Sequence, residues 1–345
     1  MNDDRQAEHV DERSGSPGQA PPNSKEQKPR MPGVGTAMIT DPGQAEGAAI
    51  GRMWYTAPLP PPPKGWLIYN ESFVLAALQG CMADLTKVRI TPSWIILARV
   101  VMGMMAVVQA VVMLIATIPV LNWGLETVAR TFTRNSFGFF LRGAYWKAKL
   151  KSLGQNTMID QNVEIWGPEN VSIGSHCHID TFVRLGAGNR RQGQRGSIEI
   201  ANHVHLGPGV HIAGRGGVRI GDLVGISANA HIYSATGVAM IPSDPGQLVS
   251  MSHMAPKDQQ HVYEAPVIIE EYSFVGIMAR VMPGVTIGRG AIVHASSEVT
   301  RSVPPFSNFG GNPRGRQIGW RKPLRPSPKL QARSDMQSSQ AQSAT

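Results

Sequence analysis

Aliphatic residues recur at every sixth position in the second half of the chain. The clearest run is Ile269, Val275, Val281, Ile287, Val293 and Val299. A small or β-branched residue stands four places after each: Ser273, Ala279, Val285, Ala291, Ser297 and Val303. A period of six fits neither an amphipathic helix nor an alternating strand over this length. It predicts short strands, three to each coil, with the aliphatic side chains inside and the coils stacked as parallel sheets.

Shorter runs of the same period begin near Leu153, and two insertions interrupt them. The first insertion runs from Gly186 to Gly196, and the second covers 237–265. Long insertions in a regular solenoid are usually functional. Glycines that follow an aliphatic position are predicted to form the sharp corners. They are Gly174, Gly207, Gly221, Gly276 and Gly288.

An apolar segment precedes the repeat. Residues 100–120 contain no charged side chain, and as a helix they would reach about 30 Å, the thickness of a bilayer core. The segment predicts a membrane-spanning or re-entrant helix, and a helix buried within an oligomer is the alternative. The positive-inside rule then places the residues from 127 onward in the cytoplasm.

These patterns divide the 345 residues into four parts. We expect a disordered Pro/Gly-rich tail over 1–63, a helical segment over 64–150, a repeat domain over 151–320 and a disordered basic tail over 321–345. Two cysteines exclude a disulfide scaffold and fit a reducing compartment.

The net charge of +9 is concentrated in two stretches, 127–151 and 301–345. Basic stretches beside a near-neutral body indicate contact with phosphate groups, either of a cofactor or of anionic lipid. Aromatic residues do not alternate with these basic residues, which argues against nucleic acid as a partner.

Several longer phrases join the repeat: VSIGSHCHID (171–180), VRIGDLVGISANAHIYSAT (218–236), APVIIEEYSFVGIMARVMPGVTIG (265–288), VTRSVPPF (299–306) and GGNP (310–313). Over about 135–320 the chain resembles the hexapeptide-repeat acyltransferases, and most of all their polysaccharide and sugar O-acetyltransferases. The resemblance implies a mainly β fold, a left-handed parallel β-helix, assembled as a homotrimer with the active site between the coil faces of two subunits.

The resemblance also implies a reaction. Acetyl-CoA would donate an acetyl group to a sugar or lipid-linked saccharide in exopolysaccharide, capsule or lipopolysaccharide synthesis. The enzyme would work at the cytoplasmic face of the inner membrane, or in the cytoplasm. The positions that match cofactor contacts in similar proteins are Gly276, Ala279, Ser297, Arg301 and Arg314.

The catalytic base is less clear from the motifs. In the maltose-type sugar acetyltransferases a histidine directly follows a phrase like IYSAT, but here Gly237 stands at that place. His253 in the second insertion is the candidate base, because similar enzymes carry a loop histidine at this distance before a PV–I–E phrase. His261 is the weaker candidate and could contact substrate, as could Asn229.

We expect no metal site, because no two histidines have the five-residue separation that hexapeptide carbonic anhydrases use, although histidines of different coils could still meet. Two other functions stay open. One is a non-catalytic trimeric scaffold for a membrane-bound polysaccharide synthesis complex, and the other is N-acetylation of an amino sugar.

Overall fold

The computed structural model describes residues 42–54, 56–81, 85–188, 196–238, 249–311 and 316–320, which lie in one compact unit. Most of the predicted N-terminal tail and all of 321–345 lie outside the described residues. Within the predicted disordered tail, however, Pro42–Gly51 form helix α1. This helix is stabilised by packing on the last coil, where a Cβ on Gly51 would meet the ring of Phe306.

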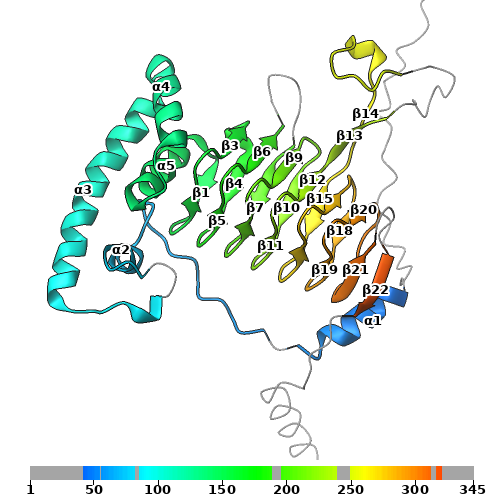
Figure 1. Ribbon diagram of the computed structural model, residues 1–345, viewed down its shortest axis with the longest axis horizontal. Coiled ribbons are helices and arrows are strands. Elements are labelled where there is room, and N and C mark those ends of the chain that lie inside the picture. The colour runs from blue at the N-terminus through cyan, green and yellow to red at the C-terminus, as the bar shows by residue number, and fades with distance from the viewer. Residues whose placement is uncertain are drawn as a thin grey trace, which may run out of the picture. The chain divides into compact units, whose positions relative to one another are not determined.

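The repeat forms six stacked coils, each of three short parallel strands (Figure 1). The first sheet has the order β1-β4-β7-β10-β15-β18, the second begins β2-β5-β8-β11-β16-β19, and the third is β3-β6-β9-β12-β17-β20. The bounds of the first nine strands are β1 Ser152–Leu153, β2 Met158–Ile159, β3 Glu164–Trp166, β4 Val171–Ile173, β5 His178–Ile179, β6 Arg184–Ala187, β7 Ile198–Ile200, β8 His205–Leu206 and β9 His211–Gly214. The later strands are β10 Val218–Ile220, β11 Gly225–Ile226, β12 His231–Tyr233, β15 Val267–Ile269, β16 Phe274–Val275, β17 Arg280–Val281, β18 Thr286–Ile287, β19 Ile292–Val293 and β20 Glu298–Val299.

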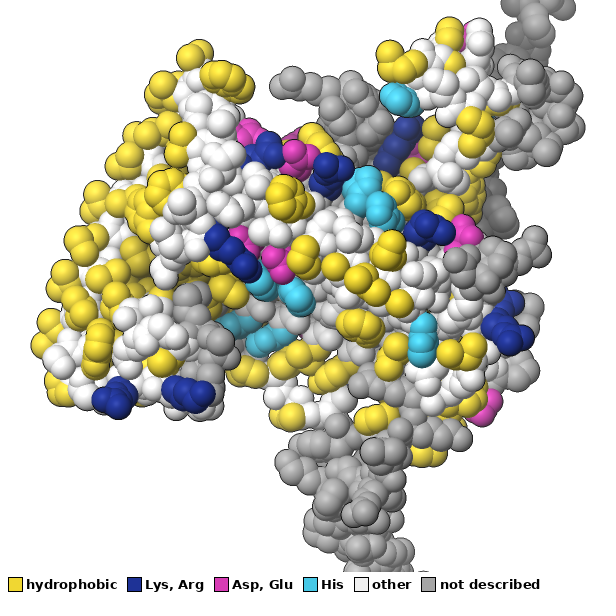
Figure 2. All heavy atoms as spheres, in the orientation of Figure 1, with side chains coloured by type: hydrophobic (Ala, Val, Ile, Leu, Met, Phe, Trp, Pro, Cys, Tyr) yellow, Lys and Arg dark blue, Asp and Glu magenta, His cyan; other side chains and the backbone are white. Residues whose placement is uncertain are grey.

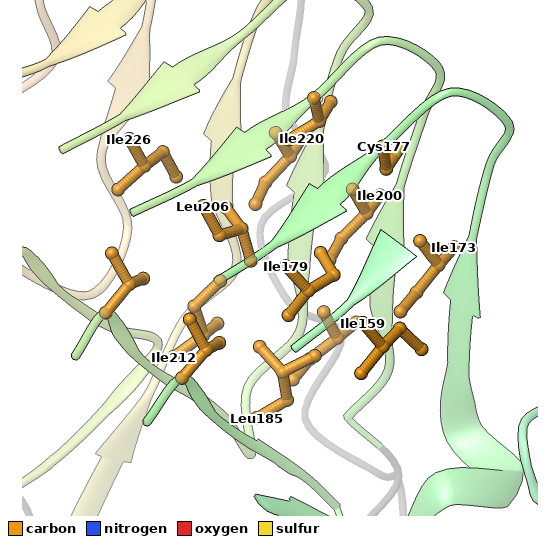
Figure 3. Close-up of a cluster of buried hydrophobic side chains, with 14 of the residues drawn as sticks. Ile159, Ile173, Cys177, Ile179, Leu185, Ile200, Leu206, Ile212, Ile220 and Ile226 are labelled. Atoms are coloured by element: carbon orange, nitrogen blue, oxygen red, sulfur yellow. The ribbon is translucent and has the colours of Figure 1, made fainter. Parts of the chain in front are cut away.

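The aliphatic residues of the repeat form columns inside the coils. In the second sheet Ile159 pairs with Ile179, Ile179 with Leu206, and Leu206 with Ile226. Figure 3 shows their side chains stacked in the interior, and each is at most 1% exposed. The predicted parallel β-helix is therefore confirmed, because a six-residue period puts one aliphatic side chain of each strand into this dry interior.

The corners differ from the prediction. Most corner residues in the left-handed region are not glycine: eleven non-glycine residues have φ between 54° and 60°. They are Asn156, Asn162, His176, Phe182, His203, Leu223, Asn229, Tyr272, Met278, Ser296 and Phe306. The predicted corner glycines have another role, because the next coil approaches them closely. A Cβ on Gly276 would lie 2.6 Å from the amide nitrogen of Ala295.

Besides α1, the described residues before the coils form four more α-helices: α2 Glu71–Leu78, α3 Pro92–Ala116, α4 Pro119–Thr131 and α5 Ser136–Lys149. The apolar segment predicted as one helix at 100–120 is split between the end of α3 and the start of α4. Helix α3 begins eight residues earlier, where Pro92 suits the first turn, and it ends before Pro119, which starts α4. Helix α5 packs on β1 and β2 and so joins the helices to the first coil.

Three arginines of the basic stretch 127–151 hold the helices to the coils. Arg130 pairs with Glu164 at 2.6 Å, and Arg134 pairs with Asp160 at 2.6 Å. Arg142 is fully buried, and its Nε donates to the carbonyl oxygen of Ile159. Half of the positive charge of this stretch therefore joins two parts of the fold, and contact of the stretch with phosphate groups stays a prediction.

Both insertions leave the coils after the third sheet. The first includes residues 189–195, which lie outside the described residues. The second starts as strand β13 Ala235–Gly237, which pairs antiparallel with β14 Val262–Glu264. Together with 249–261 these strands form an arm that projects beyond the edge of the coils (Figure 1). The other short elements are η1 Leu85–Lys87, η2 Pro168–Asn170, η4 Lys257–Gln259 in the arm, and the antiparallel pair β21 Ser307–Gly310 and β22 Arg316–Trp320.

Candidate functional site

A polar column follows the outer face of the third sheet beside both insertions. Each residue pairs in register with the next one. The column is Glu164, Arg184, His211, His231, Arg280 and Glu298. Figure 2 shows histidine and arginine side chains gathered on this side of the coils. This face can therefore offer hydrogen-bond donors, acceptors and cations to a polar ligand.

Two histidines and a tyrosine meet in the middle of this column. The Nδ1 atom of His231 lies 2.9 Å from the hydroxyl of Tyr233, and the ring of His211 stands edge-on to His231 at 5.7 Å. When Nδ1 of His231 carries the proton and donates it to Tyr233, the other ring nitrogen is left as a base. The group thus has the arrangement of a histidine oriented by a second residue.

Burial lowers the pKa of His211, and the neighbouring His231 and Arg184 lower it further. A neutral imidazole is the form that can accept a proton. Sequence reasoning did not single out His211, His231 or Tyr233. The signal available was their separation, because residues 20 places apart in successive coils become neighbours.

The structure places the predicted base away from this group. His253 lies in an exposed turn of the arm, and His261 is half-buried just before β14. Among the described residues, neither one is joined to His211 or His231 by a hydrogen bond or ring contact. If His253 takes part in proton transfer, the arm must therefore carry it to a site other than the polar column beside which the arm begins.

Asn229 and three of the predicted cofactor positions have structural explanations. Asn229 occupies a left-handed corner, a conformation that asparagine tolerates well. Ala279 and Ser297 are buried, and the amide of Gly276 donates to Val293 of the next coil. The Ser297 hydroxyl has no hydrogen-bond partner among the described residues, so it keeps a free polar atom at this corner.

Of the two arginines predicted to contact phosphate groups, one lies within the described residues. Arg301 is exposed after the last strand of the sixth coil, where its guanidinium can reach a ligand on the coil surface. A guanidinium group matches the geometry of phosphate oxygens. Arg314 lies outside the described residues.

Histidines of different coils do meet, as the sequence left open. His178 and His205 stack at 5.3 Å, and with Asp180 they form the one group in the described ranges that could hold a metal ion, with ligand atoms within 4.8 Å of one another. However, Arg134 lies 2.6 Å from Asp160 and 3.8 Å from Asp180. This guanidinium already supplies a positive charge to the carboxylates, which disfavours a second cation there.

Treatment with EDTA is accordingly expected to leave the activity of the protein unchanged. The physical reason is that Arg134 occupies the place of a cation beside Asp180. The measurement is the transfer rate before and after dialysis against the chelator, with elemental analysis of the dialysed protein. A loss of rate that Zn²⁺ restores would contradict this expectation.

The stability of the coils is expected to fall as the pH drops from about 7.5 to 5.5. Burial lowers the pKa of His176, His178 and His211 below the usual 6.5, so the unfolded chain binds more protons in this range. The measurement is the urea midpoint at both values. Replacing His176 and His178 with asparagine should reduce the loss, and an equal loss in this variant would contradict the assignment.

Comparison with known proteins finds relatives that are named as sugar acyltransferases. The chain is 29% identical over 163 residues to dTDP-4-amino-4,6-dideoxy-D-glucose acyltransferase of Escherichia coli, covering 47% of this chain and 79% of the relative. It is 30% identical over 145 residues to the putative lipopolysaccharide biosynthesis O-acetyl transferase WbbJ of E. coli K12, covering 42% and 66%. The putative colanic acid biosynthesis acetyltransferase WcaF of E. coli K12 is 28% identical over 119 residues, and the chain covers 65% of it, so WbbJ and WcaF are each matched over slightly less than two thirds of their length.

Solved structures give a weaker likeness. AntD, an N-acyltransferase from Bacillus cereus in complex with dTDP and 3-hydroxybutyryl-CoA, is 24% identical, with 56% of this chain and 94% of AntD covered and a TM-score of 0.45. No family model matches the chain.

Proposed function

Because the chain belongs to the hexapeptide-repeat acyltransferase superfamily, we propose that it transfers an acetyl group from acetyl-CoA to a hydroxyl of a sugar in cell-surface polysaccharide synthesis. The observation that carries the proposal is the stack of six repeat coils interrupted by a projecting arm, in a chain whose relatives are named as sugar acyltransferases. The proposal includes a left-handed β-helix and assembly of the protein as a homotrimer.

The reaction needs a base, an acceptor and a thioester. The acceptor oxygen attacks the thioester carbonyl carbon while the base takes the hydroxyl proton. The tetrahedral intermediate collapses, the carbon–sulfur bond breaks, and the CoA thiolate takes the proton from the base. Donors that face the developing oxyanion contribute strongly to such steps.

His253 is the proposed base, and it acts across a subunit boundary. Its arm projects beyond its own coils, as expected for a segment that closes a groove formed with a neighbouring subunit (Figure 1). His261 near the base of the arm and Asn229 at a corner then contact the sugar. His231, oriented by Tyr233, is the rival base, because its geometry is already that of a positioned imidazole.

The acyl donor binds along the coils near their C-terminal end. Arg301 and Arg314 contact the phosphates of acetyl-CoA, and the pantetheine arm passes the corners at Gly276, Ala279 and Ser297. The backbone amide of Gly276 and the carbonyl oxygens of Gly276, Ala279 and Ser297 are already bonded within the coils. Among the described residues, the side-chain polar atom left unpaired at these positions is the buried Ser297 hydroxyl. The donor supplies the activated acyl group, and the protein supplies orientation and proton transfer.

Transfer to an amino sugar is the second candidate. The relative from E. coli that is matched over most of its length is named as an acyltransferase for a dTDP-linked amino sugar. An amine differs from a hydroxyl at the reacting atom, but it needs the same removal of a proton during attack. This candidate therefore uses the same groove and the same donor site.

We infer that the protein works at the cytoplasmic face of the inner membrane, where a lipid-linked saccharide would be within reach. Helix α3 has the length and composition of a membrane segment, with a mean hydropathy of 2.3 over an 18-residue window, and only 17% of that window is buried. The low burial supports membrane contact over the alternative of a core helix.

The test is a side-by-side assay of acceptors with the full-length protein and acetyl-CoA. The acceptors are a nucleotide-linked amino sugar, a nucleotide-linked neutral sugar and a lipid-linked saccharide, and free CoA thiol is measured. O-acetylation predicts thiol release with hydroxyl acceptors, and release with the amino sugar alone favours the second candidate. No release with any acceptor, from protein that is shown to be folded, would oppose both and favour the non-catalytic scaffold.

A further inference from the structure

Helices α3 and α4 present a continuous apolar surface to the outside. Seven side chains of α3 at spacings of one to four residues are between 43% and 65% exposed. They are Ile96, Leu97, Val100, Met104, Val107, Val111 and Leu114. Val120, Leu121, Trp123 and Val128 of α4 are between 51% and 83% exposed. Figure 2 shows these two helices covered with apolar atoms along their outer side, and we call this surface the apolar face.

The opposite side of α3 is fixed to the rest of the fold. Gln109 is fully buried within α3, and its amide oxygen accepts the backbone N–H of Ile68 at 3.0 Å. Its amide nitrogen donates to the carbonyl oxygen of Trp66 at 2.9 Å. One polar side chain in the inner half of the helix thus holds the extended segment 66–70.

That segment is bonded in turn to the first coil. The carbonyl oxygen of Ile68 accepts the amide of Asn156 at 2.8 Å, and the side chain of Asn156 accepts the amide of Asn70 at 3.0 Å. Gln155 donates to Leu67 at 2.7 Å. Helix α3 is therefore tied to the first coil by a chain of buried and partly buried hydrogen bonds that starts well inside the helix.

These bonds decide how α3 can meet a membrane. A 25-residue helix is about 37 Å long, and Gln109 would lie about 8 Å from its midpoint. If α3 crossed a bilayer, Gln109 would lie inside the hydrocarbon core, which extends about 15 Å on each side of the centre. The bonded segment 66–70 and the first coil would be drawn in with it, and their polar groups would lose water.

We propose that α3 and α4 lie in the plane of the membrane, with the apolar face buried in one leaflet of an anionic phospholipid bilayer. The inference rests on the proposed membrane location and makes it specific, because it replaces a spanning helix with a docking surface on one side. The coils then stay entirely in water on the same side as both ends of α3.

The residues around the apolar face fit a leaflet of anionic lipid. Lys87 and Arg89 are exposed just before α3, where they would face phosphate groups. Trp123 is 79% exposed at the start of α4, and tryptophan is typical of the boundary between headgroups and acyl chains. An amphipathic surface of this kind lies in the interface rather than across it.

Vesicle binding tests the surface. The full-length protein is mixed with vesicles of phosphatidylethanolamine and phosphatidylglycerol and sedimented. The variant Val107→Glu/Val111→Glu is expected to lose at least ten-fold in vesicle affinity. Met254→Glu, at an apolar position on the arm that is more exposed than Val107 or Val111, is the control and should bind as the unchanged protein does. Equal binding by all three proteins would overturn the proposal.

Labelling of Cys81 tests the orientation. This cysteine is partly exposed and precedes α3, whereas Cys177 is buried in the coils. Protein bound to the outside of sealed vesicles should react at Cys81 with a membrane-impermeant maleimide as fast as free protein does, and Cys81→Ser gives the background. Protection of Cys81 until detergent is added would show that α3 spans the bilayer, against the proposal.

The outcomes separate this inference from the proposed reaction. Acetyl transfer to a water-soluble acceptor should be the same in Val107→Glu/Val111→Glu and the unchanged protein. The unchanged protein could instead fail to bind vesicles and form oligomers that light scattering detects and that Val107→Glu/Val111→Glu abolishes. That result would overturn membrane docking alone. If the unchanged protein binds vesicles but transfers no acetyl group to any acceptor, the proposed reaction is wrong and membrane docking stands.

Discussion

His253→Ala is expected to lower kcat/KM for acetyl transfer by about 10²–10⁴-fold, the usual contribution of a positioned general base. The loss should fall on kcat, because the imidazole is needed while the acceptor oxygen attacks the thioester. The measurement is thiol release at saturating acetyl-CoA, together with calorimetry to show that donor binding is kept.

The controls for this experiment come from the same arm and from the coils. Met254→Ala removes a neighbouring exposed side chain and should leave the rate nearly unchanged. His231→Ala tests the rival base, whose Nδ1 is held by Tyr233. If His231→Ala loses activity and His253→Ala keeps it, the assignment of the base to the arm is wrong and the polar column is the catalytic site.

Arg142→Met is expected to lower the free energy of unfolding by about 3–5 kcal/mol, as for other buried charges that lose a partner. Arg142 is fully buried between α5 and the first coil. Its Nε donates to Ile159 and its Nη1 to Phe132, both at 2.8 Å, and Asp160 lies 4.0 Å from its Nη2. The substitution leaves two carbonyl oxygens without this donor and removes one of the two guanidinium groups beside the buried carboxylate of Asp160. The measurement is urea unfolding followed by tryptophan fluorescence.

Arg219→Met is the matched control for Arg142. Arg219 pairs with Glu199 at 3.3 Å on the outside of the first sheet, and both side chains are largely exposed. Exposed pairs contribute about 0–1 kcal/mol, so this variant should unfold close to the unchanged protein. An equal effect of the two substitutions would show that Arg142 does not join the helices to the coils in the way described.

The coil interior could be predicted from the sequence because it depends on local spacing alone. A strand of a few residues places one aliphatic side chain inward, so Ile269, Val275 and Val281 fix the period without knowledge of distant contacts. The corners could not be predicted as well. Residues such as Phe182 and Leu223 adopt a left-handed conformation that their side chains rarely take, because the stacked coils impose it.

The contacts between distant segments were also beyond sequence reasoning. Gln109 was one amide in an apolar run, and only the structure shows it bonded to residues about 40 positions earlier. The histidine pairs follow the same rule. Insertions change the coil length, so His178 and His205 are 27 positions apart whereas His211 and His231 are 20 apart. A fixed spacing could not find both pairs.

The position of the candidate base shows what the sequence could and could not supply. The break in the repeat correctly indicated an insertion, and the structure shows an arm held by the pairing of β13 with β14. Where the tip of that arm acts depends on a neighbouring subunit, which no pattern within one chain encodes.

Calorimetry of acetyl-CoA binding to the full-length protein tests the central claim most directly. Saturable binding with one site per subunit, weakened at least several-fold in Arg301→Ala, is the result expected of an acyltransferase that holds its donor along the coils. Absence of binding by protein with intact secondary structure and a cooperative unfolding transition would contradict the account and favour a scaffold without catalytic activity.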